Sequence, residues 1–326
     1  MKSLLLLLVL ISCATKKEKG FDKELSSFSY PYSVSIFSLE TQGQKLHMSY
    51  MDIVSQEPNG KVIVLLHGKN FSGFYWKETI EFLTKAGFRV IVPDQIGFGK
   101  SSKPASYQFS FHVLAENTHK LLDSLNINRA TIIGHSMGGM LATRYTLMYP
   151  NDVEKLLLVN PIGLEDYKVL APYKNIETLY SQELKANPDS IREYQKNAYY
   201  AGEWKEEYEN LITALKGWTE HSDYPQVAWN AALTAEMIYT QPVVYEFQNI
   251  KNPTLLIIGQ RDRTAIGKAW VSKEEAAKMG LYPELGRKTH KLIKGSKLVE
   301  IPGVGHLPQV ENFSAYKDAV LVFLAN

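Results

Sequence analysis

The sequence contains a single cysteine, Cys13, among its 326 residues. A lone cysteine excludes a disulfide within the chain, so the fold must depend on the burial of apolar side chains. The formal net charge is only +2, which gives no support for a nucleic-acid-binding protein. With 45% hydrophobic and 21% charged residues, the composition is that of a globular protein, either one large α/β domain with an insertion or two domains.

The apolar run near the N-terminus is too short to cross a membrane. Residues 4–11 fall far below the ~20 residues that a spanning helix needs. They follow Lys2 and have the length of the apolar core of a signal peptide. We therefore expect residues 1–12 to be a signal peptide.

Cys13 directly follows this segment. Leu10-Ile11-Ser12-Cys13 resembles the bacterial lipobox, in which the cysteine is acylated and becomes the mature N-terminus. The sequence therefore predicts a lipidated Cys13, a tether at residues 13–30 that is solvated at residues 16–20, and an exported cell-envelope lipoprotein that associates with a membrane. A secretory signal in which the cysteine has no role is the alternative.

Short apolar runs and amphipathic stretches alternate along the rest of the chain, which is typical of a mostly parallel, doubly wound α/β sheet. Buried strands are predicted at residues 62–66, 90–92, 131–133, 156–159, 254–258 and 298–301, after an antiparallel hairpin of residues 32–39 and 45–53. Helices are predicted at residues 74–86, 111–125, 140–149 and 312–324.

One segment, residues 164–242, interrupts this alternation. It has no buried-strand run, and it is rich in tyrosine and tryptophan. We predict an α-helical cap that is inserted at this point and lies over the carboxyl edge of the sheet. A few of its aromatic side chains should line a pocket that faces Ser136. The core then consists of residues 31–163 and 243–326.

A serine stands at an abrupt turn between a predicted strand and a helix. Gly134-His135-Ser136-Met137-Gly138 fits the pattern G-x-S-x-G. The flanking residues must be small to let the backbone turn, and the serine hydroxyl then projects above the sheet edge. Ser136 is therefore the candidate nucleophile.

A serine hydroxyl needs a base within hydrogen-bond reach, and that base needs an orienting partner. In a doubly wound sheet such groups gather at the carboxyl ends of the strands, where Asp262 and His306 follow the last two predicted strands. We expect His306 to take the proton from Ser136, and Asp262 to orient the imidazole. Asp166 and Asp223 are the alternative acids.

The negative oxygen formed by such an attack needs donors that are fixed in advance, an oxyanion hole. Met137 opens a helix, so its N–H is free to point there. The loop after residues 62–66 should supply the second donor. Lys69 N–H, directly after His67-Gly68, is the first candidate, and Asn70 is the alternative.

These pieces together resemble the α/β-hydrolase superfamily. The matching residues are His67-Gly68, residues 94–101, the turn around Ser136, Asp262 and Gly305-His306, which fall in the family's order. The resemblance implies an eight-stranded, mostly parallel sheet, a cap inserted after the sixth strand, and hydrolysis without a cofactor. The histidines form no close group that would indicate a metal site.

A serine nucleophile in this family favours a carboxylesterase, because an alkoxide leaves more easily than an amine. The aromatic insertion indicates an apolar acyl or aryl group in the substrate. C–C bond hydrolases, lactonases and perhydrolases with the same residues stay open, as does a ligand-binding protein with slow turnover. The expected partner is a small ester, with no nucleic acid, and the oligomeric state is open.

The lipid anchor predicts the outcome of one substitution. Cys13→Ala removes the only thiol, so the protein should leave the membrane fraction or accumulate unprocessed when cells are fractionated and blotted. Ser12→Ala keeps a small residue before the cysteine and should stay with the membranes. Unchanged sedimentation of the Cys13 variant would rule out this anchor.

Overall fold

The computed structural model describes residues 19–326, so the predicted signal peptide and Cys13 lie outside the described residues. The strands are β1 (Val34–Thr41), β2 (Gln44–Ile53), β3 (Val62–Leu66), β4 (Arg89–Pro93), β5 (Ala130–His135), β6 (Val153–Val159), β7 (Thr254–Gly259) and β8 (Lys297–Ile301). The helices of the core are α1 (Lys77–Lys85), α2 (Phe111–Ser124), α3 (Met137–Met148), α9 (Lys273–Ala276), α10 (Tyr282–Leu292), α11 (Pro308–Glu311) and α12 (Phe313–Ala325).

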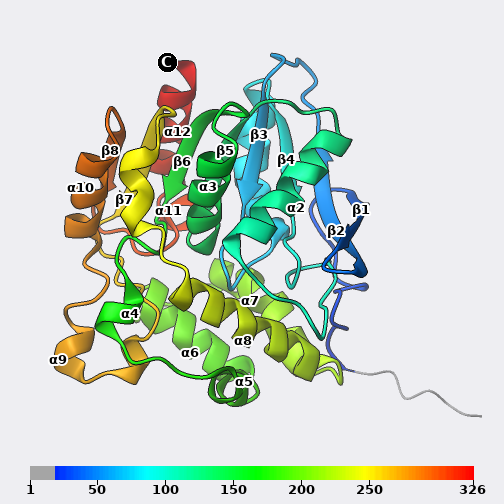
Figure 1. Ribbon diagram of the computed structural model, residues 1–326, viewed down its shortest axis with the longest axis vertical. Coiled ribbons are helices and arrows are strands. Elements are labelled where there is room, and N and C mark those ends of the chain that lie inside the picture. The colour runs from blue at the N-terminus through cyan, green and yellow to red at the C-terminus, as the bar shows by residue number, and fades with distance from the viewer. Residues whose placement is uncertain (1–18) are drawn as a thin grey trace, which may run out of the picture.

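The eight strands form one sheet in the order β1-β2-β4-β3-β5-β6-β7-β8 (Figure 1). Strand β2 pairs antiparallel with both β1 and β4, whereas every pairing from β4 to β8 is parallel. The predicted fold class, a mostly parallel eight-stranded α/β sheet, is confirmed.

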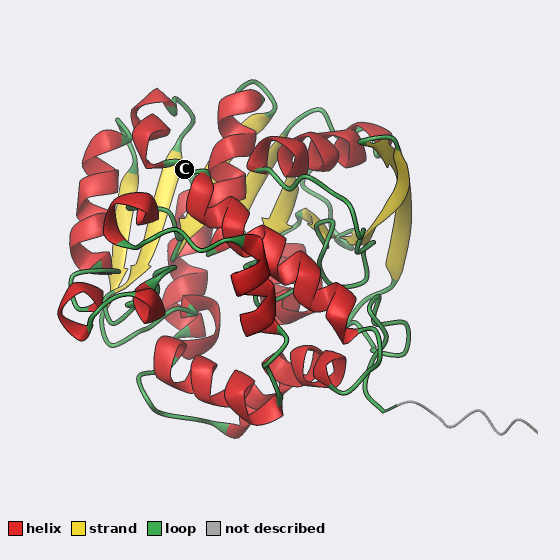
Figure 2. Ribbon diagram, turned by 60° about the horizontal axis from the view of Figure 1, so that its bottom comes forward, coloured by secondary structure: helices red, strands yellow, loops and turns green. Residues whose placement is uncertain are grey.

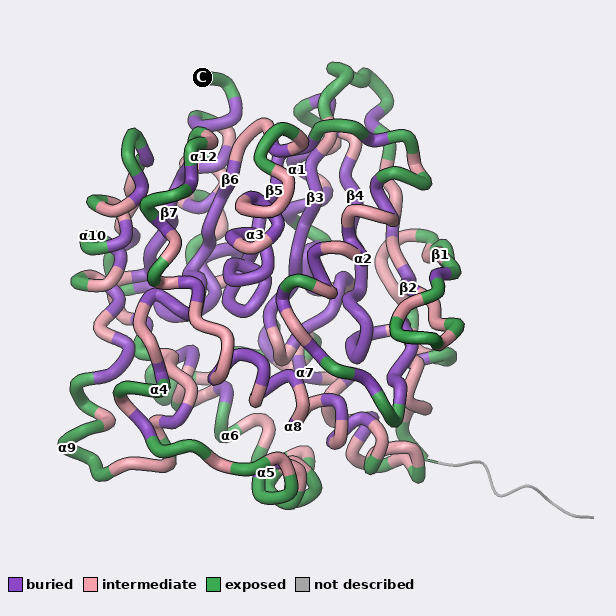
Figure 3. The backbone as a smooth tube through the Cα atoms, viewed as in Figure 1, coloured by how far each residue is buried: buried purple, intermediate pink, exposed green. Residues whose placement is uncertain are grey.

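Apolar side chains cover both faces of this sheet, because alternate residues of a strand point to opposite sides. In β3, Ile63 and Leu65 belong to one apolar cluster with α1 and α12, while Val64 and Leu66 belong to another with α2 and α3. Strands β3 and β5 are buried almost throughout (Figure 3). This double coverage explains why the central strands are uninterrupted apolar runs.

The first core helix starts later than the sequence predicts. Residues Gly73–Trp76 form a 3₁₀ turn, and α1 begins only at Lys77. The N–H of Gly73 donates to Asp94 Oδ1 (2.6 Å), and the side chain of Trp76 is fully buried. These contacts with the core hold the turn in a tighter geometry than the apolar periodicity suggests.

The segment between β6 and β7 is helical. It contains α4 (Tyr167–Leu170), α5 (Ile176–Glu183), α6 (Pro188–Tyr199), α7 (Glu206–Thr219) and α8 (Tyr224–Thr240). These helices lie across the lower end of the sheet in Figure 1 and in front of it in Figure 2. They form the cap, and they cover the carboxyl ends of the strands, where the predicted site residues stand.

The predicted tether continues into a packed segment. Leu25 is fully buried in a cluster with Trp218 of α7 and Val227 of α8. The N–H of Phe21 donates to Gly217 O (3.0 Å), and the hydroxyl of Tyr30 donates to Asp94 Oδ2 (2.6 Å). The tether expected up to residue 30 is therefore packed from Phe21 onward, because the cap and the core offer an apolar surface that composition does not reveal.

Between residues 19 and 326, no helix combines the length and the apolar character that crossing a bilayer requires.

The packing of this segment can be tested by shortening its central side chain. Leu25→Ala should lower the free energy of unfolding by about 2–5 kcal/mol, because it leaves a cavity between the segment and the cap. Urea denaturation followed by tryptophan fluorescence measures this change. Val322→Ala, at a side chain that is 63% exposed on α12, should change the free energy by no more than about 0.5 kcal/mol. Equal stability of the two variants would mean that Leu25 is not packed.

Candidate active site

Ser136 joins β5 to α3 in a strained backbone conformation, with φ 56° and ψ −122°. A non-glycine residue in such a region costs on the order of 1–3 kcal/mol and needs support from its surroundings. Its N–H donates to Val159 O (3.2 Å), and its carbonyl accepts from the N–H groups of Gly139 (2.9 Å) and Ile162 (3.2 Å). The turn is thus held from both sides.

The two glycines that flank the turn are required by close packing. A Cβ atom on Gly134 would lie 2.1 Å from the carbonyl oxygen of Gly138, and one on Gly138 would lie 2.2 Å from the carbonyl oxygen of Leu66. Neither glycine has a positive φ. The pattern G-x-S-x-G therefore lets α3 begin directly against β5 and β3.

The structure brings together three predicted site residues, Ser136, His306 and Asp262, from the ends of β5, β8 and β7. His306 Nε2 lies 2.9 Å from Ser136 Oγ, and His306 Nδ1 lies 2.7 Å from Asp262 Oδ2. A carboxylate only accepts, so Nδ1 carries a proton and Nε2 is left to accept from the serine hydroxyl. The side chains of His306 and Asp262 are fully buried, and Ser136 is 6% exposed.

Asp262 remains charged in spite of its burial. Burial alone would raise the pKa of this carboxyl group, but the attraction of His306 and the hydrogen bonds from His306 and from Thr264 lower it below its usual range. The N–H of Thr264 donates to Asp262 Oδ1 at 2.8 Å. A charged acceptor at this position keeps the imidazole of His306 in one orientation.

Asn160 is a site residue that the sequence reasoning missed. It follows β6, is fully buried and has a φ of 37°. Its amide nitrogen donates to Asp262 Oδ2 (2.7 Å) and to Gly305 O (2.8 Å), and its amide oxygen accepts from Gly259 N–H (2.7 Å). Asn160 thereby connects the loops that carry Asp262 and His306. Its position at a predicted strand end is the only signal that could have identified it.

His135, inside the serine turn, is a second missed residue. Its Nε2 lies 2.8 Å from the carbonyl oxygen of His306, and its Nδ1 lies 3.0 Å from the hydroxyl of Tyr75. Burial, together with the repulsion that a protonated His306 would exert, lowers the pKa of His135 to about 3. The ring is therefore neutral, donates from Nε2 to the backbone of His306, and accepts from Tyr75.

The loop after β3 lies directly against Ser136. A Cβ atom on Gly68 would stand 3.0 Å from Ser136 Cβ. His67 Nδ1–H donates to Gly68 O (2.9 Å), and the N–H of Gln95 donates to His67 Nε2 (3.1 Å), which fixes the loop.

The two predicted oxyanion donors, the N–H groups of Met137 and Lys69, directly follow Ser136 and Gly68 in the chain. Met137 is the first residue of α3, so its N–H has no partner within the helix. Lys69 directly follows Gly68 in the loop. The arrangement is compatible with an oxyanion hole formed by these two N–H groups.

The side chains of Lys69 and of the alternative donor residue, Asn70, reach the cap. Lys69 Nζ donates to Glu183 Oε1 at the end of α5 (2.9 Å), and Asn70 Nδ2 donates to the hydroxyl of Tyr199 at the end of α6 (2.8 Å). The cap is therefore attached to the loop that faces Ser136.

The alternative acids lie elsewhere. Asp166 caps α4 by accepting from Lys168 N–H (3.0 Å) and also accepts from the hydroxyl of Tyr245 (2.8 Å). Asp223 accepts from Lys23 N–H (3.1 Å) at the start of α8. Both carboxylates thus serve the packing of the cap, whereas Asp262 is the one bonded to His306.

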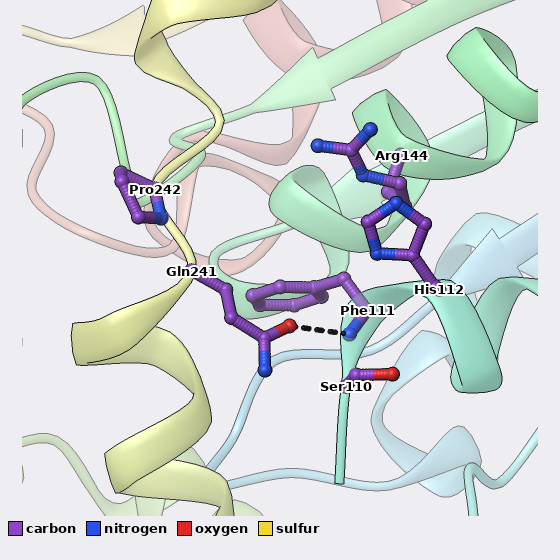
Figure 4. Close-up of a pocket in the computed structure, with 6 residues that line it drawn as sticks. All are labelled: Ser110, Phe111, His112, Arg144, Gln241 and Pro242. Carbon is purple, nitrogen blue, oxygen red and sulfur yellow. Dashed lines mark hydrogen bonds between the residues drawn. The ribbon is translucent and has the colours of Figure 1, made fainter.

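A surface pocket near the second junction between cap and core is separate from this site. It is lined by Ser110, Phe111, His112, Arg144, Gln241 and Pro242 (Figure 4). Gln241 Oε1 accepts from Phe111 N–H (3.0 Å), and Arg144 is paired with Glu246.

Within residues 19–326, no group of three or more His, Cys, Asp or Glu side chains is placed to hold a metal ion.

A mostly parallel sheet that carries a serine at a strand-to-helix corner, with a histidine and an acid at later strand ends, defines the class of α/β hydrolases. The chain belongs to the α/β-hydrolase fold family, whose model matches residues 61–313.

Individual relatives have different activities. A probable hydrolytic enzyme from Pseudomonas aeruginosa PAO1 is 47% identical, with a TM-score of 0.92 over 95% of this chain and 99% of that one. A bromoperoxidase from Bacillus anthracis is 25% identical, with a TM-score of 0.69 over 90% and 100% of the two chains. The 2-hydroxy-6-oxononadienedioate/2-hydroxy-6-oxononatrienedioate hydrolase of Comamonas testosteroni is 27% identical over 276 residues, 82% of this chain and 88% of that protein.

The bridging role of Asn160 predicts a loss of stability. Asn160→Ala leaves Gly259 N–H and Gly305 O without their partner and takes a donor from Asp262, so the free energy of unfolding should fall by about 3 kcal/mol or more. Urea denaturation measures this loss. Asn312→Ala, which removes the cap of α12, is the matched control and should cost about 1 kcal/mol. A loss for Asn160→Ala no larger than that of the control would contradict the bridge.

Proposed function

We propose that the protein is a serine hydrolase that cleaves carboxylic esters with an apolar acyl or aryl group through an acyl-enzyme. The observation that carries this proposal is the continuous hydrogen-bonded arrangement from Ser136 Oγ through His306 to Asp262. A neutral imidazole that accepts from a hydroxyl and donates to a charged carboxylate is the arrangement that activates a serine.

The reaction follows from these positions. Ser136 Oγ attacks the ester carbonyl carbon while its proton passes to His306 Nε2, and the N–H groups of Met137 and Lys69 bind the resulting oxyanion. The bond to the alcohol then breaks, and His306 returns its proton to the leaving oxygen. Water attacks the acyl-enzyme in the same way, which releases the acid and restores Ser136.

The surroundings of the site support an apolar substrate group. The ring of Tyr199 stacks on the imidazole of His306, and Phe71 lies 6.1 Å from Tyr199 and 5.9 Å from His135, measured between ring centroids. The nearby ammonium group of Lys69 is already paired with Glu183, so it offers little charge to an anionic substrate.

A C–C bond hydrolase is the second candidate, because the chain aligns with the Comamonas hydrolase over 82% of its length. Lactone hydrolysis and perhydrolysis use the same nucleophile. A panel that contains p-nitrophenyl esters, lactones and a vinylogous 1,5-diketone separates these activities. Tight binding of a substrate without turnover would instead indicate a ligand-binding protein.

The place of action that we propose is the cell envelope, with the chain anchored through a lipid on Cys13. The lipobox-like sequence at residues 10–13 supports this location.

The nucleophile and the acid can be tested in the same assay. Ser136→Ala should lower kcat toward p-nitrophenyl esters by about 10⁶-fold, as expected when a nucleophilic serine is lost. Asp262→Asn should lower kcat by about 10⁴-fold, because the imidazole would favour the wrong tautomer. Ser38→Ala, at an exposed position of β1, is the control.

A fluorophosphonate probe should label the peptide that contains Ser136 in the wild type and in the control, and should leave Ser136→Ala unlabelled. A Ser136→Ala protein that keeps a tenth of the activity would eliminate Ser136 as the nucleophile. A mild effect of Asp262→Asn would mean that another group orients His306.

A further inference from the structure

One cap residue, Tyr199, contacts both His306 and the loop after β3 that faces Ser136. It is the last residue of α6 and is only 4% exposed. Its ring lies on the imidazole of His306, with the ring centroids 4.6 Å apart and an interplanar angle of 27°. Its hydroxyl accepts from Asn70 Nδ2 at 2.8 Å.

The stacked ring occupies a face of His306 that the hydrogen bonds leave free. Both imidazole nitrogens are bonded in the ring plane, to Asp262 and to Ser136. His306 has no exposed surface, so water cannot solvate the positive charge that appears when it takes the serine proton. A cation within about 6 Å of an aromatic face is attracted by the quadrupole of the ring. The ring of Tyr199 is placed to provide this attraction.

The backbone holds Tyr199 in this position. Its carbonyl oxygen accepts from the N–H of His306 at 3.4 Å. A Cβ atom on Gly305 would lie 2.1 Å from the same oxygen, so the end of α6 can approach His306 only over a glycine. Gly305, which precedes His306 in the sequence motif, is therefore required by a contact with the cap.

The hydroxyl of Tyr199 extends the same contact to the loop after β3. Asn70 follows Lys69, whose N–H is the proposed oxyanion donor, and Lys69 Nζ is bound to Glu183 of the cap. The two consecutive side chains of this loop are thus both held by cap helices.

We propose that Tyr199 is a positioning residue for the ester hydrolysis proposed above. Its ring stabilises the protonated imidazole of His306 during proton transfer, and its hydroxyl holds, through Asn70, the loop that carries the Lys69 N–H. This inference rests on the proposed function, and it makes the cap a part of the reaction machinery as well as a cover.

Two substitutions separate the ring from the hydroxyl. Tyr199→Leu removes the aromatic face and should lower kcat about 10-fold with little change in KM, since the contact matters most once the imidazole is charged. Tyr199→Phe keeps the face and should restore kcat to within about 3-fold of the wild type. Both are measured with p-nitrophenyl esters, with thermal unfolding recorded in parallel.

The chain offers matched controls in neighbouring tyrosines. Tyr200→Phe removes a buried hydroxyl that makes no hydrogen bond within the described residues, and Tyr208→Leu removes a ring that stacks on Tyr200 at 3.8 Å. Both controls change the cap without changing a side chain that contacts His306. They should therefore keep kcat within about 2-fold of the wild type, a smaller change than we expect from the loss of a cation–π contact. Tyr199→Met replaces the leucine variant if the latter does not fold.

The link to the loop is tested by Asn70→Ala and by the double variant with Tyr199→Phe. Both single substitutions remove the same hydrogen bond, so the double variant should be no less active than the less active of the two single variants. Fully additive losses would overturn the Asn70 part of the proposal.

Two other results would overturn the role of the ring. One is a Tyr199→Leu protein whose kcat is unchanged and whose turnover is still abolished by Ser136→Ala. The other is a loss of kcat that is equal in Tyr199→Leu and Tyr208→Leu, which would show an effect on the cap in general. Wild-type turnover that does not depend on Ser136 would instead remove the proposed function, and the positioning role with it.

Discussion

The hydrogen bonding of the buried His306 is the constraint on which the site depends. A fully buried polar group must find its partners within the protein. The two ring nitrogens bind Asp262 and Ser136, the carbonyl accepts from His135, and the N–H donates to the carbonyl of Tyr199. These partners come from the end of β5 and the turn after it, from the loop after β7 and from the cap, so the ring and the backbone of His306 have all their hydrogen bonds only when these elements are assembled.

The strained backbone of Ser136 is held in place by close packing around the turn. The sheet on both sides of the turn is covered by apolar clusters, and close contacts at Gly134 and Gly138 leave the backbone no room to relax. The cap adds a further layer, since it binds the loop after β3 through Asn70 and supports His306 through Tyr199. The segment from Phe21 to Tyr30 in turn packs on α7 and α8, so the N-terminal part of the described chain contributes to the position of the cap.

Much of this arrangement could be predicted from the sequence, because local patterns carry it. Uninterrupted apolar runs predict strands that are covered on both faces, and the change of pattern after residue 163 predicts the cap. Ser136 stands in a turn whose residue types are dictated by close packing, while Asp262 and His306 directly follow apolar runs. The helix predicted at residues 74–86 starts late, because contacts of Gly73 and Trp76 with the core decide its first turn.

The sequence by itself determined the order of the strands along the chain, the position of the cap and the three residues of the proposed reaction, since each depends on its immediate neighbours in the chain. Only the tertiary structure showed that Asn160 bridges two loops, that His135 is a neutral donor to His306, and that Tyr199 lies on the imidazole. An asparagine, a histidine or a tyrosine has many possible partners. Which one it binds depends on elements far away in the chain, whose approach is set by packing.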